Sequence, residues 1–112
     1  MSVERVPSSF ASFSELVTVT GNGTWIHIAG QVGFDDTGKQ VVEGGVAEQT
    51  RVIFDQIERL LVGAGASLDS VIKLTVYMTD LGEYGEFSAV RTERFPEKQP
   101  ASAAVGVSDL LL

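Results

Sequence analysis

Few residues in this chain have side chains that could do chemistry alone, and each stands in a context typical of a structural role. His27, the single histidine, could act as a general base because an imidazole titrates near neutrality. It alternates with Ile26 and Ile28, with no acid or nucleophile beside it, so a structural or surface role is favoured. Ser88 lies near Gly85, but a nucleophile elbow needs Gly-x-Ser-x-Gly at a strand-to-helix turn, and this serine falls inside a predicted helix.

Two short segments could bind ions. Residues 63–67, Gly-Ala-Gly-Ala-Ser, look like a phosphate-binding loop, but they follow a predicted helix and lack the Lys-Ser/Thr ending, so a helix cap is favoured. Asp35 and Asp36 could bind a cation together, yet consecutive acids beside Gly38 are typical of a solvated turn. The chain has no cysteine, which excludes disulfides and thiolate ligands. We expect no metal and no other cofactor.

Aromatic side chains could stack on a planar ligand. Trp25, Tyr77 and Phe87 fall at core spacing in predicted strands and helices, so we assign them to the core. Tyr84 and Phe13 remain as candidate pocket walls. No basic groove or base-stacking platform predicts nucleic-acid binding.

Composition indicates one domain, residues 1–112, with more apolar surface than a single small chain would bury by itself. A hydrophobic content of 44% is high for so small a chain and favours burial against other subunits; a tightly packed monomer is the alternative. Eight Lys and Arg against fifteen Asp and Glu give a formal charge of −7, which disfavours polyanions and anionic membranes. No segment approaches the ~20 apolar residues that span a bilayer, and no signal peptide is evident, so a cytoplasmic location is the simplest expectation.

The first half of the chain predicts three strands and a helix. Residues 16–20 are rich in β-branched side chains, residues 21–23 (Gly-Asn-Gly) suit a hairpin, and residues 25–29 form the second strand. A turn at residues 35–39 precedes a short strand at Val41 and Val42. A helix then follows Gly45, ending at Gly63 or Gly65. Its expected apolar stripe consists of Val46, Thr50, Ile53, Ile57, Leu60 and Ala64.

The second half predicts strand, helix and strand. Residues 71–78 alternate Lys73, Thr75 and Tyr77 against Ile72, Leu74, Val76 and Met78, as a strand would. Asp80 precedes Glu83 at capping-box spacing, so a helix should run over residues 81–95, with Tyr84, Phe87, Arg91 and Phe95 on one side. Residues 103–107 can return to the sheet. The order predicts an α+β domain, its two helices packed on one face of a mixed, mostly antiparallel sheet.

Several stretches, in this order, give the chain a family resemblance: residues 29–31 (Ala-Gly-Gln), 46–51, 65–77 and 79–81 (Thr-Asp-Leu). Over residues 13–107 the sequence resembles the Rid (reactive intermediate deaminase, also YjgF) family, whose members are also labelled endoribonuclease L-PSP. The resemblance implies a chorismate-mutase-like (YjgF-like) fold, a homotrimer, and a small-molecule pocket between subunits that hydrolyses 2-imino acids or their enamine tautomers to 2-keto acids and ammonia.

Residue by residue, the resemblance places the ligand pocket at positions where this chain has lost polar groups. The pocket residues that it implies are Phe13, Ala29, Gly30, Ser88, Ser102 and Ala104, and the aromatic candidate Tyr84 is added to them. The family's carboxylate-binding arginine is Ser102 here, and a serine hydroxyl cannot make the two parallel charge-assisted hydrogen bonds of a guanidinium. Arg91 or Arg94 could reach the pocket from the helix, but no spacing rule places either of them there. Catalytic residues are left open.

Relatives continue into a final strand that carries a glutamate suited to activating water, whereas this sequence stops at Leu112. Either the natural chain is longer or it lacks that acid; three terminal leucines favour the first. Two functions remain in view. One is a divergent, metal-free imine or enamine hydrolase that does not act on the usual 2-imino acids, and the other is a non-catalytic trimer that binds or senses a small ligand.

Overall fold

The computed structural model describes residues 1–9 and 12–111, and the chain divides into two compact units, Met1–Gln31 and Val32–Leu112. The prediction of a single domain over residues 1–112 stays a prediction. No helix in the described residues is long and apolar enough to cross a membrane.

The first unit is an antiparallel sheet in the order β1-β2-β3, formed by Ser2–Pro7, Ser14–Thr20 and Thr24–Ile28. The hairpin between β2 and β3 confirms the prediction from its Gly-Asn-Gly turn, and Gly23 has a positive φ of 146°. Strand β1 was not predicted, although its two β-branched residues, Val3 and Val6, are a weak strand signal. Leu16 on β2 is buried.

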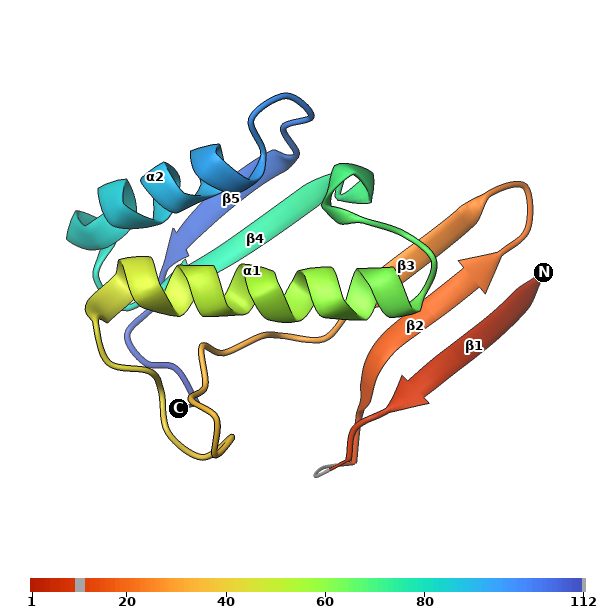
Figure 1. The fold of residues 1–112 in the computed structure, drawn as a ribbon, viewed down its shortest axis with the longest axis horizontal. Coiled ribbons are helices and arrows are strands. Elements are labelled where there is room, and N and C mark those ends of the chain that lie inside the picture. Colours follow the sequence, from red (N-terminus) through yellow and green to blue (C-terminus); the bar gives the residue numbers. More distant parts are fainter. Residues whose placement is uncertain (10–11, 112) are drawn as a thin grey trace. The chain divides into compact units, whose positions relative to one another are not determined.

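The second unit combines two helices with a two-stranded parallel sheet. Helix α1 (Gly45–Gly63) is followed by the 3₁₀ turn η1 (Leu68–Ser70), strand β4 (Lys73–Met78), η2 (Leu81–Glu83), helix α2 (Tyr84–Arg94) and strand β5 (Ala101–Gly106). Strands β4 and β5 are parallel, with Leu74 opposite Ser102, because α2 carries the chain back to the start of the sheet. Figure 1 shows α1 and α2 lying beside these strands.

Local sequence explains where the helices begin and end. Gly44 precedes α1 with a left-handed φ of 110°, and Gly65 turns the chain after α1 with φ 82°, a conformation that costs glycine little. The prediction that the helix stops at Gly63 or Gly65 is confirmed: α1 ends at Gly63, and Gly65 takes the left-handed conformation. Asp80 accepts a hydrogen bond from the Gly82 amide at 2.8 Å, which caps η2, and the expected helix over residues 81–95 begins as this 3₁₀ turn. Pro96 follows the last helical turn.

Aromatic rings form the centre of the core between α1 and α2. Phe54 is 2% exposed; its ring centroid lies 6.3 Å from that of Phe87 and 5.4 Å from that of Phe95, the latter edge to face. Such pairs add to the free energy gained from burial. Strand β4 turns Leu74, Val76 and Met78 inward, so its predicted alternation is confirmed for these residues.

Several sequence predictions were wrong. Val41 makes only an isolated bridge with Phe34, since the turn around residues 35–40 leaves no length for a strand. In the α1 stripe, Thr50 and Leu60 are buried as predicted, but the other buried residues are Phe54 and Leu61, which were not predicted; the helix turns Phe54 toward the α2 aromatics. Two residues that we assigned to the core are instead exposed, namely Trp25 at 58% and Tyr77 at 57%.

Candidate functional site

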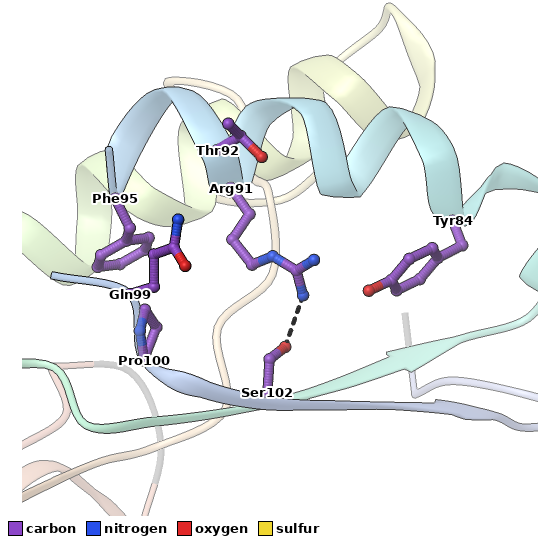
Figure 2. Close-up of a pocket in the computed structure, with 7 residues that line it drawn as sticks. All are labelled: Tyr84, Arg91, Thr92, Phe95, Gln99, Pro100 and Ser102. Atoms are coloured by element: carbon purple, nitrogen blue, oxygen red, sulfur yellow. Dashed lines mark hydrogen bonds between the residues drawn. The ribbon is translucent and has the colours of Figure 1, made fainter. Parts of the chain in front are cut away.

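A cavity of about 450 Å³ opens beside α2 in the second unit. Helix α2 and its end supply Tyr84, Arg91, Thr92 and Phe95, and the loop into β5 and the strand itself supply Gln99, Pro100 and Ser102. Its volume lies within the range of small-molecule sites. In Figure 2 the Arg91 side chain reaches down from the helix toward Ser102, with Tyr84 on one side and Phe95, Gln99 and Pro100 on the other.

The guanidinium of Arg91 is the charged centre of this cavity. Its Nη1 donates to Ser102 Oγ at 2.8 Å, and its Nη2 donates to Ser88 Oγ at 3.2 Å. Each bond has a charged donor, which strengthens it relative to a neutral pair. Two serines, one on α2 and one on β5, thereby fix the position of this cation.

Two aromatic rings also hold the guanidinium. Arg91 Cζ lies 5.6 Å from the ring centroid of Tyr84 and 5.3 Å from that of Phe87, distances at which a cation is attracted to a ring face. Residues 87, 88 and 91 follow residue 84 by three, four and seven positions, so all four lie on one side of the helix. The predicted shared side of Tyr84, Phe87, Arg91 and Phe95 is confirmed.

Arg91 keeps hydrogen-bonding capacity for a ligand. A guanidinium has five N–H donors, and the two serine hydroxyls accept two of these hydrogen bonds. No carboxylate of the described residues lies within salt-bridge distance of it. Arg94, three residues further along α2, differs from Arg91 because it has a carboxylate partner. Its Nη1 lies 2.8 Å from Asp55 Oδ1 of α1. The cation at Arg91 is therefore available for an anion.

The structure brings together only some of the site residues predicted from sequence. Tyr84 and Ser102 line the cavity, and Ser88 contacts its arginine. Ala104 lies two residues beyond Ser102 on β5, and thus on the same face of the strand, but it is not among the residues that line the cavity.

Phe13, Ala29 and Gly30 belong to the first unit. Phe13 is exposed and its carbonyl accepts a hydrogen bond from the Ser8 amide, while the Ala29 amide donates to the Glu15 carbonyl. Gly30 is exposed at the end of the sheet. Their assignment to a ligand pocket stays a prediction.

The other chemical candidates lie outside the cavity lining. His27 is exposed on β3. The Asp35 side chain accepts hydrogen bonds from the Thr37 hydroxyl and amide, as expected of a turn. The Thr37 hydroxyl holds the pKa of the Asp35 carboxyl below its ordinary value.

Sequence reasoning named Arg91 and Arg94 as side chains that could reach the pocket, but it did not choose between them or place Arg91 at Ser102. The signal was present in the spacing, because Arg91 follows Tyr84, Phe87 and Ser88 at helical intervals of seven, four and three. What the sequence could not supply was the closeness of this helix face to Ser102, eleven residues further along.

Comparisons with known proteins match nearly the whole length of the chain. A family model described as Endoribonuclease L-PSP matches residues 3–111. A RutC family protein of Pyrococcus abyssi is 37% identical over 96% of this chain and 82% of its own length. The rat 2-iminobutanoate/2-iminopropanoate deaminase is 30% identical over 98% of this chain and 78% of its own length.

Among solved structures, the crystal structure of RidA from an Antarctic Psychrobacter is 33% identical, with a TM-score of 0.80 over 96% of this chain and 84% of that chain. This likeness extends over nearly all of the chain. It confirms the predicted α+β fold class.

Proposed function

The chain belongs to the Endoribonuclease L-PSP family, also called Rid or YjgF, and from that premise we propose that it hydrolyses the imine or enamine form of small 2-imino acids to a 2-keto acid and ammonia. The relatives that match most of its length include 2-iminobutanoate/2-iminopropanoate deaminases. The substrate class rests on one observation, the position of Arg91.

The position of Arg91 argues against the expectation that this chain does not act on the usual 2-imino acids. The sequence analysis reasoned that Ser102 leaves the pocket without a guanidinium to bind a carboxylate. In the structure Arg91 Nη1 lies 2.8 Å from Ser102 Oγ, so a guanidinium from the helix stands directly against that residue. A carboxylate can then accept two parallel hydrogen bonds from the free N–H donors of Arg91.

Hydrolysis needs no redox chemistry. Water adds to the imine carbon, and the resulting carbinolamine loses ammonia to give the keto acid. The contribution of the protein is to hold the carboxylate on Arg91 so that the imine carbon has a fixed orientation. The buried ring of Phe95 and the ring of Pro100 offer an apolar wall to the substrate side chain.

We also propose a homotrimer with the pocket at a subunit boundary. Apolar side chains of the second unit that stay exposed in the single chain support this assembly, among them Ile72 and Tyr77, at 64% and 57%, and Val105 at 41%. Sedimentation equilibrium should give three times the chain mass; a monomer at micromolar concentration would contradict the proposal.

A second candidate is a non-catalytic trimer that binds a small carboxylate. One observation favours it: the described residues that line the cavity include no carboxylate and no imidazole, the groups that most often activate water. The two candidates share Arg91 as the anion site and differ only in turnover.

A coupled assay separates them. An L-amino-acid oxidase acting on 2-aminobutanoate generates 2-iminobutanoate, and the release of 2-ketobutanoate is followed with and without the protein. We expect the protein to accelerate this release well above the spontaneous rate. Binding of 2-ketobutanoate without acceleration would favour the second candidate, and neither binding nor acceleration would refute both.

A further inference from the structure

Tyr84 presents a phenol to the same cavity. It is the first residue of α2, it is half-buried, and it lines the cavity beside Arg91. Figure 2 shows the ring extending from the helix with its hydroxyl directed toward the guanidinium side of the pocket. No hydrogen bond to this hydroxyl is found among the described residues.

The geometry of a 2-imino acid explains why this position matters. Its imine nitrogen and its carboxylate are on adjacent carbons, so a group that binds the nitrogen must lie within a few ångströms of the group that binds the carboxylate. The Tyr84 ring centroid is 5.6 Å from Arg91 Cζ. A substrate held by Arg91 can therefore place its nitrogen or the attacking water against the Tyr84 hydroxyl.

The neighbouring polar groups are less suited to proton transfer. The Thr92 hydroxyl donates to the Ser88 carbonyl at 3.0 Å, and the Ser102 hydroxyl accepts from Arg91. The Gln99 amide can hydrogen-bond but does not give up a proton at ordinary pH. A phenol is an accepted general acid and base.

We propose that Tyr84 is a catalytic residue, which gives a proton to the substrate nitrogen and takes one from the attacking water. This inference rests on the proposed imine hydrolysis. It assigns the proton transfer to a residue of this chain's own pocket wall.

Each step balances. The water oxygen forms a bond to the imine carbon, the π pair of C=N moves to nitrogen, and nitrogen takes the phenol proton; the phenolate then removes a proton from the bound water oxygen. In the second step nitrogen takes the phenol proton again and leaves as ammonia with the C–N electron pair. The hydroxyl oxygen forms the keto C=O and returns its proton to the phenolate.

The test compares Tyr84→Phe with wild type in the oxidase-coupled assay and in calorimetric titration with 2-ketobutanoate. Phenylalanine keeps the ring beside Arg91 and removes only the hydroxyl. Thr37→Val is the control, because it also removes one hydroxyl, and Thr37 lies in an exposed turn and does not line the cavity. General acid–base groups typically contribute about 10²- to 10⁴-fold to rate.

We expect Tyr84→Phe to lower kcat at least tenfold while the Kd for 2-ketobutanoate stays within about twofold, and Thr37→Val to change neither. An active wild type with an equally active Tyr84→Phe variant overturns the catalytic assignment and leaves the proposed function intact. Loss of kcat together with loss of keto-acid binding also overturns it, since Tyr84 would then act by holding Arg91. A silent wild type refutes the proposed function itself.

Discussion

Replacing Arg91 by methionine tests the carboxylate site directly. Methionine keeps much of the apolar stem of arginine and removes the guanidinium that Ser88 and Ser102 hold in place. A hydrogen bond to a charged group contributes about 1.5–3 kcal/mol, which corresponds to a Kd for 2-ketobutanoate weakened about tenfold to 150-fold. Arg91→Lys should fall between the two, because an ammonium keeps the charge without the planar pair of donors.

Isothermal titration calorimetry measures this effect, with two controls. Arg94→Met removes an arginine of the same helix whose partner is Asp55, outside the cavity lining, so its Kd should match wild type. The neutral amide 2-ketobutanamide should bind wild type and Arg91→Met equally, because it has no carboxylate. Equal affinity of wild type and Arg91→Met for 2-ketobutanoate would refute the assignment of Arg91 as the anion site.

Three further predictions concern the exchange of the cation, the core and the turn. The double variant Arg91→Ser/Ser102→Arg should bind 2-ketobutanoate more tightly than Arg91→Ser alone, because the two side chains meet at 2.8 Å and the exchange returns a guanidinium to nearly the same space; equal calorimetric affinities would contradict this. Phe54→Ala should lower the free energy of unfolding by about 3–5 kcal/mol in a urea titration, since the ring is 2% exposed and contacts the rings of Phe87 and Phe95, whereas exposed Val62→Ala on the same helix should change it by less than about 0.5 kcal/mol. The pKa of the Asp35 carboxyl, measured by NMR titration, should lie below 3.8. The stability that its ionised form contributes is therefore present above 3.8 and is lost as pH falls through the lowered pKa. Thr37→Val should return the pKa toward 3.8, and an unchanged pKa would contradict the Thr37 hydroxyl as the cause.

The sequence predicted elements well where the pattern was local. Turn residues at 21–23 and 65, the alternation of β4 and the spacing of the α2 aromatics all depend on neighbours within a few residues, and the structure confirms each of them. Strand β1 was missed because a short stretch with only two valines resembles a polar terminus.

The errors in burial have a different cause. Periodicity gives the face of an element but not which neighbour covers it, so it missed Phe54 and Leu61 in the buried stripe of α1. The same limit applies to Trp25 and Tyr77, which are strand residues with apolar rings that lie exposed in the single chain.

The candidate site was predicted in part, for a related reason. Ser88 and Ser102 were named from the resemblance and Tyr84 as an aromatic pocket wall, and the structure brings the three around one cavity or its arginine. Arg91 was not placed there because its contact with Ser102 joins a helix to a strand across an intervening loop. A distance of that kind depends on how the helix packs on the sheet, which residue spacing alone does not specify.

The clamping of Arg91 by two hydroxyls and two rings has an entropic consequence. An arginine side chain loses up to about 2 kcal/mol of rotamer freedom when it is immobilised, and here the folded chain has already restricted it through Ser88, Ser102, Tyr84 and Phe87. An incoming anion therefore meets a preorganised receptor and does not have to order a mobile side chain. Loosening the clamp at Ser88 would shift that cost from folding to association, so affinity would fall even though the guanidinium itself is retained.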